Sequence, residues 1–227
     1  MLSTSYEAQR KKVVEHLILM GYLKTPSVIR ALLTVPRELF VPGHLVEYAY
    51  VDSPLPIGYG QTISAMHMVA IMTEELAPEP GDVVLEVGTG SGYQAAVLAE
   101  IVAKQDPRKR GHVYTIERIP ELVEFAKRNL ARAGYSEYVT VIQGDGTLGY
   151  PEKAPFNKVI VTAAAPNVPR PLLDQLAEGG RLVIPVGDLH VQRLLIVEKR
   201  EGVFHKKWSI ECVFVPLVGE YGWKITT

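Results

Sequence analysis

From about residue 80 onward, short apolar runs alternate with segments of helical spacing. Five runs have the length and bounding turn residues of buried strands: 83–87, 111–117, 139–143, 159–162 and 182–186. Three segments between them have the apolar period of helices: 94–102, 120–134 and 172–177. Strands that alternate with helices predict an α/β domain with a mostly parallel sheet.

The first 80 residues carry mainly helical spacing instead. Three helices are expected there: from a capping box at Thr4 and Glu7 to about Gly21, from Thr25-Pro26 to Leu33, and from Ser64 or Ala65 to Leu76. Residues 37–60 are rich in proline, glycine and tyrosine and are expected to be irregular. We therefore expect a helical N-terminal extension over 1–80 and a core domain over 81–227.

The C-terminal part lacks a helix between its last two apolar runs, 194–199 and 210–216. A hairpin is the simplest connection, and it would add an antiparallel strand to the sheet. The predicted fold class is thus α/β, with a doubly wound, mostly parallel, seven-stranded sheet and a C-terminal antiparallel hairpin.

Composition narrows the possible partners. The 227 residues are 47% hydrophobic and 22% charged with a net charge of −1, so no broad basic footprint for nucleic acid exists. The single cysteine, Cys212, lies in an apolar run and is expected to be a buried hydrophobe. No apolar run approaches the length of a membrane span. We expect a cytoplasmic monomer that binds neither membrane, nucleic acid nor metal.

A glycine-rich turn follows the first strand of the core domain. Glu86-x-Gly88-x-Gly90-x-Gly92 separates the strand 83–87 from the helix that follows it. A dinucleotide fingerprint would need glycine at position 93, which is Tyr93, and a phosphate-binding P-loop would need a lysine that is absent. The spacing that remains resembles motif I of the S-adenosylmethionine-dependent methyltransferases. A glycine-rich turn without a ligand is the alternative.

The resemblance to motif I predicts a site for S-adenosylmethionine, and the next two strands end in suitable residues. The motif residues Glu86, Gly88, Thr89, Gly90, Ser91 and Gly92 are the first expected contacts. Glu117, followed by Arg118, can accept hydrogen bonds from both ribose hydroxyls, unless it is only a helix-start acid. Asp145 can accept from the adenine amino group and Gly146 allows close approach, although Gly-Asp-Gly is also an ordinary turn.

The segment after the fourth strand bears on the methyl acceptor. Residues 162–169 contain no carboxylate, histidine or cysteine that could serve as a general base. A carboxylate acceptor is already ionised at neutral pH, so it needs alignment with the methyl group rather than deprotonation. The segment therefore suits an anionic acceptor.

Motifs along nearly the whole chain resemble those of the protein-L-isoaspartate O-methyltransferases. The matching segments, in chain order, are 52–68, 144–146, 154–156, 163–166, 179–182 and 213–217. The first of these, Asp-Ser-Pro-Leu-Pro-Ile-Gly-Tyr-Gly-Gln-Thr-Ile-Ser-Ala-Met-His-Met, is the most specific. The resemblance implies a Rossmann-like methyltransferase fold and a repair enzyme. Such an enzyme methylates the free carboxylate of L-isoaspartyl residues in damaged proteins and peptides, and the ester then closes spontaneously to a succinimide.

The resemblance also implies roles for individual residues. Ser64 would be the active-site hydroxyl near the reacting carboxylate, although from the sequence alone it could equally be a helix N-cap. Further contacts are expected to the cofactor from Ala65, Met66 and His67, and to the peptide from Ile57, Gln61, Thr62, Val213, Phe214 and Val215. Met66 departs from the family, which usually has proline there. Trp223 would either close over the site or anchor the C-terminus.

Two other functions remain open on the sequence alone. One is a methyltransferase that uses the same cofactor on RNA, which the neutral charge disfavours. The other is a module that binds the cofactor without catalysis, in which Ser64 would be scaffold only.

Overall fold

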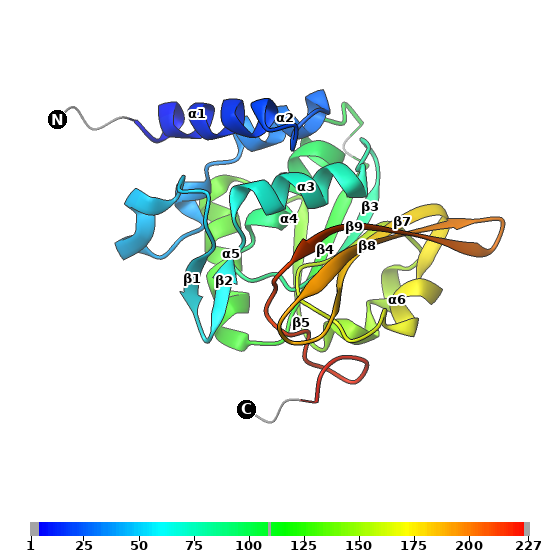
Figure 1. Cartoon of the computed structure of the whole chain (residues 1–227). Coiled ribbons are helices and arrows are strands. Elements are labelled where there is room, and N and C mark those ends of the chain that lie inside the picture. Colours follow the sequence, from blue (N-terminus) through cyan, green and yellow to red (C-terminus); the bar gives the residue numbers. More distant parts are fainter. Residues whose placement is uncertain (1–4, 109, 225–227) are drawn as a thin grey trace.

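Seven strands form the central sheet of the computed structural model, which describes residues 5–108 and 110–224. Their order is β5-β4-β3-β6-β7-β8-β9. The bounds are β3 Val83–Val87, β4 His112–Glu117, β5 Val139–Gln143, β6 Phe156–Val161, β7 Leu176–Gly187, β8 Gln192–Arg200 and β9 Val203–Cys212. Neighbours from β5 to β7 pair in parallel, and β8 pairs antiparallel with both β7 and β9. The predicted mostly parallel, doubly wound, seven-stranded sheet and its C-terminal hairpin are confirmed, and Figure 1 shows how the strands are arranged.

The last hairpin is tighter than the sequence predicts. Strand β9 begins at Val203 rather than near 210, and only Glu201 and Gly202, both with positive φ, connect it to β8. Such two-residue turns match the right-handed twist of the flanking strands. Strand β9 lies at the edge of the sheet and most of its side chains are exposed, so it lacks the apolar run by which strands are recognised.

Helices on one face of the sheet are longer than those on the other. Helix α3 (Met66–Leu76), α4 (Tyr93–Ala99), continued by the π-helical turn η3 (Glu100–Lys104), and α5 (Pro120–Ala133) pack on the first face. The second face carries α6 (Arg170–Asp174) and the single turns η4 (Gly146–Leu148) and η5 (Pro151–Lys153). Alternate strand residues supply the two cores, for example Val84 to the first and Leu85 to the second.

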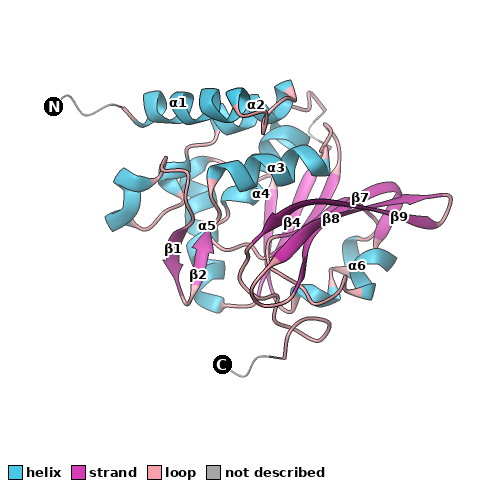
Figure 2. Ribbon diagram, viewed as in Figure 1, coloured by secondary structure: helices cyan, strands magenta, loops and turns pink. Residues whose placement is uncertain are grey.

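The N-terminal helices form a further layer over α3 and α4 (Figures 1 and 2). They are α1 (Tyr6–Leu19), α2 (Pro26–Thr34) and the 3₁₀ turns η1 (Arg37–Leu39) and η2 (Gly43–Tyr48). Ser5 caps α1 by accepting from the Ala8 N–H, and the predicted capping residue Thr4 lies outside the described residues.

Helix α2 begins at Pro26 as predicted, but its capping partner comes from far along the chain. The Thr25 side chain makes no capping bond and instead donates to Glu74. Glu74 in turn accepts from the backbone N–H groups of Lys24 and Thr25, both at 2.8 Å. A carboxylate from α3 thus fixes the N-terminal layer to the sheet-covering helix.

A small hairpin interrupts the segment that the sequence predicts to be irregular. Strands β1 (Leu55–Gly58) and β2 (Gln61–Ile63) pair antiparallel around a tip at Tyr59 and Gly60. Gly58, Tyr59 and Gly60 all have positive φ, which a tight reversal requires. The hairpin leads directly into the segment that opens α3, and so it delivers Ser64 to the sheet.

Candidate functional site

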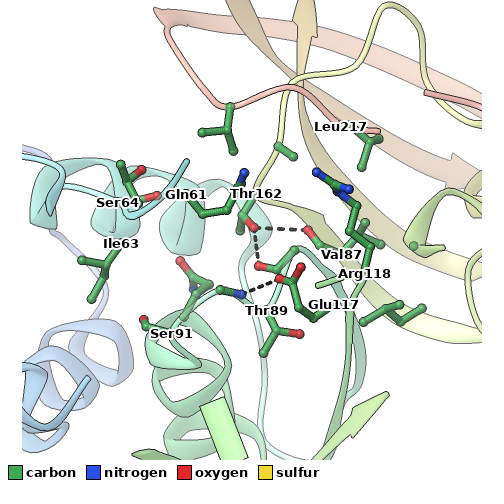
Figure 3. Close-up of a pocket in the computed structure, with 18 of the residues that line it drawn as sticks. Gln61, Ile63, Ser64, Val87, Thr89, Ser91, Glu117, Arg118, Thr162 and Leu217 are labelled. Atoms are coloured by element: carbon green, nitrogen blue, oxygen red, sulfur yellow. Dashed lines mark hydrogen bonds between the residues drawn. The ribbon is translucent and has the colours of Figure 1, made fainter. Parts of the chain in front are cut away.

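A cavity lies at the carboxyl ends of β3, β4 and β6, where open α/β sheets bind ligands (Figure 3). It is lined by residues from six parts of the chain: Gln61–Ser64, with Val69 and Met72 of α3; Val87–Ser91, with Tyr93 and Gln94; Ile116–Arg118; Gly146; Thr162 and Ala163; and Val215–Val218. The residues of the predicted cofactor loop and the predicted acceptor serine therefore meet in one site.

The first two glycines of the motif adopt a backbone conformation that would be strained for any other residue. Gly88 and Gly90 have φ of 98° and 53°. A Cβ at Gly88 would lie 2.5 Å from the Thr162 Oγ1, which donates to the Gly88 carbonyl at 2.6 Å. The site thus needs glycine at 88 and a small hydroxyl residue at 162. Thr162 is a site residue that sequence reasoning missed, because there it marked only the start of a loop.

The third glycine has a different task. Gly92 does not line the cavity, and it caps the N-terminus of α4 with φ of 86°. A Cβ there would lie 3.2 Å from Leu130 and 3.4 Å from Ala126 of α5. Gly92 therefore permits two helices to pack closely behind the loop.

Glu117 is the carboxylate of the cavity. Its Oε2 accepts from the Gly90 N–H and its Oε1 from the Ile119 N–H, both at 3.0 Å. Among the described lining residues, Glu117 and Arg118 are the only charged ones. The side chain is thus fixed by the loop it faces, and its remaining lone pairs are available to a ligand that carries hydroxyl groups.

Glu86 lies beneath the loop rather than in the cavity. It is fully buried, and burial raises its pKa to about 8, so the carboxyl is protonated at neutral pH. Its Oε2 accepts from the Thr115 hydroxyl, which is bonded in turn to the Thr89 hydroxyl, each at 2.6 Å. Glu86 therefore supports the loop from inside the sheet.

Asp145 and Gly146 differ in where the structure places them. Gly146 lines the cavity, and a Cβ there would lie 2.4 Å from the Val87 Cγ1. Asp145 does not line it, and its carboxylate accepts from the backbone N–H groups of Thr147 at 2.9 Å and Glu220 at 2.7 Å. Asp145 therefore holds the C-terminal segment against the turn.

Ser64 borders the cavity opposite the cofactor loop (Figure 3). It is not the N-cap of α3, because Ala65 occupies that position. Its hydroxyl has no hydrogen-bond partner among the described residues, and no histidine or cysteine lines the cavity there. A hydroxyl without a neighbouring base is a hydrogen-bond donor rather than a nucleophile.

Ala65, Met66 and His67 do not line the cavity. Met66 is fully buried and accepts a bond from the Tyr93 hydroxyl at its sulfur, 3.5 Å away. The N–H and the ring Nδ1 of His67 both contact the Asp52 Oδ1 at 2.9 Å. The segment Ser64–His67, which we call the acceptor turn, is thus held from behind by these side chains.

The residues predicted to contact a peptide are divided between several places. Gln61, Thr62 and Val215 line the cavity, whereas Ile57, Val213 and Phe214 do not. Ile57 packs near Gly90, where a Cβ would meet its Cδ1 at 3.4 Å. Val213 is 73% exposed, and the Phe214 N–H donates to Gln192.

Trp223 anchors the C-terminal segment, because its indole N–H donates to the Ala164 carbonyl at 3.0 Å and it does not line the cavity. Within residues 5–108 and 110–224, no helix is long and apolar enough to cross a membrane, and no group of three potential metal ligands occurs.

Comparisons with known proteins agree with this geometry. The family model for protein-L-isoaspartate(D-aspartate) O-methyltransferase matches residues 8–222. A protein-L-isoaspartate O-methyltransferase of Staphylothermus marinus is 68% identical over 224 residues, which are 98% of this chain and 100% of the relative. Another, of Hyperthermus butylicus, is 60% identical over 96% of this chain and 92% of the relative.

Solved structures are similar as well. One from Plasmodium falciparum, described as a protein-L-isoaspartate O-methyltransferase in complex with S-adenosyl-L-homocysteine, has a TM-score of 0.82 and 29% identity. The match covers 92% of this chain and 98% of that one. A second structure of that name has the same TM-score at 31% identity, over 94% of this chain and 67% of the other.

Proposed function

The chain belongs to the protein-L-isoaspartate(D-aspartate) O-methyltransferase family, and from this premise we propose how its residues divide the work of the reaction. The enzyme transfers a methyl group from S-adenosylmethionine to the free carboxylate of L-isoaspartyl residues in damaged proteins and peptides. In our proposal the sheet side of the cavity holds the cofactor, and the acceptor turn aligns the carboxylate.

The residues that border the cavity fit S-adenosylmethionine. Gly88 and Gly90 line the cavity with bare backbone, and a Cβ at Gly88 would overlap the Thr162 hydroxyl. We assign the cofactor to Gly88, Thr89, Gly90, Ser91, Glu117, Arg118 and Gly146, with Glu117 accepting from the ribose hydroxyls. When bound, the cofactor supplies a methyl group on a positively charged sulfur. Glu86, Gly92 and Asp145 support these residues from behind.

Ser64 is proposed to orient the acceptor. Its free hydroxyl can donate one hydrogen bond to a carboxylate oxygen and leave the other oxygen to receive the methyl group. No proton has to be removed, because the acceptor is ionised at neutral pH. The lack of a histidine or cysteine among the described lining residues is consistent with a reaction that needs alignment and removal of water but no base.

The peptide is proposed to run past the cavity along Val213–Val215. Val215 lines the cavity and the exposed Val213 adjoins the edge strand β9, which ends at Cys212. Extended peptides bind such edges through main-chain hydrogen bonds. Gln61 and Thr62, on the hairpin side, would contact the residues next to the isoaspartate.

We further propose that the enzyme acts as a cytoplasmic monomer that does not bind nucleic acid. The net charge of −1 supports the lack of nucleic-acid binding, and a site assembled from a single chain supports the monomer. The division at residue 80 remains a proposal as well. It is supported by the fact that the described N-terminal residues supply Ser64 and the core domain supplies Glu117.

One observation carries the proposal: Ser64, which has no neighbouring general base, faces the cofactor loop across one cavity. The test uses methyl-labelled cofactor and two peptides that differ only in an isoaspartyl or an aspartyl linkage. We expect label on the isoaspartyl peptide alone, and its release as methanol when the pH is raised, because the product is a carboxyl ester.

An RNA substrate is included in the same assay to separate the other functions. Label that stays on RNA after the pH is raised would contradict the proposal and favour an RNA methyltransferase. Cofactor binding without transfer to any substrate would favour a non-catalytic module.

A further inference from the structure

A buried arginine lies behind the acceptor turn. Arg37, in the 3₁₀ turn η1, is 0% exposed, although it is the largest of the fully buried side chains. Its Nη2 donates to the Ser64 carbonyl at 2.8 Å and its Nε to the Ala49 carbonyl at 2.7 Å. One guanidinium thus joins the backbone before the hairpin to the backbone of the acceptor serine.

The charge of Arg37 has no counterion within the described part of the chain. None of the ion pairs found there includes Arg37, and its Nη1 has no hydrogen-bond partner. Its guanidinium carbon lies 5.0 Å from the centre of the Tyr93 ring, a favourable cation–π contact. Burial lowers the pKa of Arg37 from its ordinary value, but a guanidinium remains protonated at neutral pH.

A second arginine in the same layer shows that a pairing carboxylate could have been provided. Arg10, in α1, bonds to the Glu38 carboxylate at 3.1 Å and to the Tyr50 hydroxyl at 2.8 Å. The carboxylate that acts electrostatically on Arg37 is Asp52, but it is hydrogen-bonded to the N–H and the ring of His67 instead. A buried charge without a counterion destabilises the folded protein, so the presence of an arginine at this position calls for a functional reason.

We propose that Arg37 is a positioning residue that fixes the Ser64 peptide group and supplies a positive field which favours an anionic acceptor at the turn. The inference rests on the proposed role of Ser64. Arg37 bonds to the backbone behind the serine, where it attracts a carboxylate without forming an ion pair. A direct ion pair would hold the attacking oxygen and lower its reactivity. The arginine thus favours binding of the acceptor and leaves its oxygens free.

The test compares the binding of two peptides to the enzyme saturated with S-adenosylhomocysteine, so that no transfer takes place. Both peptides have the same sequence and the same isoaspartyl linkage. The first carries the free carboxylate, and the second carries a carboxamide in its place. For the wild type we expect tighter binding of the carboxylate peptide. Arg37→Met should lower the ratio of the two affinities by about tenfold, since it removes a charge at short range in a partly desolvated site.

Arg37→Lys separates the charge from the geometry. It should keep most of the preference for the carboxylate but lower turnover at saturating peptide by about tenfold, because a single ammonium cannot bond both carbonyls as the planar guanidinium does. Arg10→Met is the matched control, since it removes an arginine of the same layer that does not contact Ser64. It should leave the affinity ratio unchanged.

Several outcomes would overturn the inference. An equal loss of affinity for both peptides in Arg37→Met would mean a structural role alone, and full turnover in Arg37→Lys would mean that the two bonds do not position Ser64. If Arg37→Met does not fold, the Arg37→Lys result decides alone. Ser64→Ala is measured in parallel, so that normal turnover in that variant would refute the role of Ser64 itself rather than that of Arg37.

Discussion

The cofactor loop and the acceptor turn face each other across one cavity, but different contacts hold them. The loop follows β3 directly, and neighbouring strands fix it through Glu117, Thr162 and the Glu86–Thr115 pair. The acceptor turn follows the small hairpin β1–β2, which is not part of the central sheet. Arg37, Asp52 and Tyr93 hold it, each with one hydrogen bond or more.

This difference has a physical consequence. The loop can be fixed by backbone geometry and sheet pairing, so its requirements fall on glycines and on residues at strand ends. The turn is fixed by single side chains, so it can be displaced by one substitution without loss of the sheet. We therefore expect changes in the loop to alter cofactor affinity and stability, and changes behind the turn to alter turnover.

The largest effect is expected for Glu117→Ala. The change removes the proposed ribose acceptor and leaves the Gly90 and Ile119 N–H groups without their partner. Charge-assisted bonds of this kind predict a loss of about 4 kcal/mol, or roughly a thousandfold, in the affinity for S-adenosylhomocysteine measured by calorimetry. Glu121→Ala, on the exposed first turn of α5, is the control and should bind normally. Unchanged affinity in Glu117→Ala would refute the assignment.

The second largest effect is expected for Gly88→Ala, and it concerns the stability of the fold. The alanine would have to adopt a positive φ, and its Cβ would overlap the Thr162 hydroxyl. Together these effects should lower the free energy of unfolding by about 3 kcal/mol. Gly134→Ala is a matched control, because Gly134 has φ of 77° but open space around it. It should cost only about 1 kcal/mol in denaturant titrations. Equal costs at the two positions would show that the close approach at Gly88 is unimportant.

Glu86→Gln should alter the pH dependence of stability. Burial raises the folded-state pKa of Glu86 from 4.5 to about 8, so the folded protein binds a proton that the unfolded chain releases. The contribution of this proton to the free energy of unfolding is therefore lost as the pH rises from 4.5 toward 8. Between pH 6 and 7.5 the wild type should lose about 2 kcal/mol of unfolding free energy relative to Glu86→Gln. Parallel curves for the two proteins would contradict this, and Glu121→Gln serves as the exposed control.

Asp52→Ala should have the smallest effect, and only on the acceptor side. It removes two hydrogen bonds to His67 at the end of the acceptor turn. A loss of about 1 kcal/mol in alignment would lower turnover about fivefold and leave cofactor affinity nearly unchanged. Asp174→Ala is the control, because Asp174 lies on α6 and no residue of α6 lines the cavity. A fivefold loss of cofactor affinity in Asp52→Ala would erase the distinction between loop and turn.

The same contrast explains what could be predicted from the sequence. The core strands follow apolar runs, and the loop is recognised by its spacing, so the sheet, Gly88, Gly90 and Glu117 could be placed from the sequence. The hairpin β1–β2 could not, since its strands are only four and three residues long and β1 contains proline and glycine. Strand β9 began earlier than predicted because its exposed edge position leaves no apolar signal.

Residues that act through a distant backbone carbonyl were the hardest to predict. Arg37 and Thr162 bond to backbone carbonyls of Ser64 and Gly88, which lie 27 and 74 residues away in the sequence. No local motif encodes such a contact. Conversely, Met66 and His67 adjoin Ser64 in the chain, but a helix start turns their side chains to Tyr93 and Asp52 instead.

The central claim is that Ser64 aligns an already ionised carboxylate and takes no part in holding the cofactor. Single-turnover transfer from labelled S-adenosylmethionine to an isoaspartyl peptide, measured for the wild type and Ser64→Ala, tests it most directly. Ser209→Ala, on β9 with its hydroxyl bonded to Glu75, is the control. We predict a rate about thirtyfold lower in Ser64→Ala, with S-adenosylhomocysteine affinity within twofold of the wild type. An unchanged rate, or an equal loss of cofactor affinity, would contradict the account.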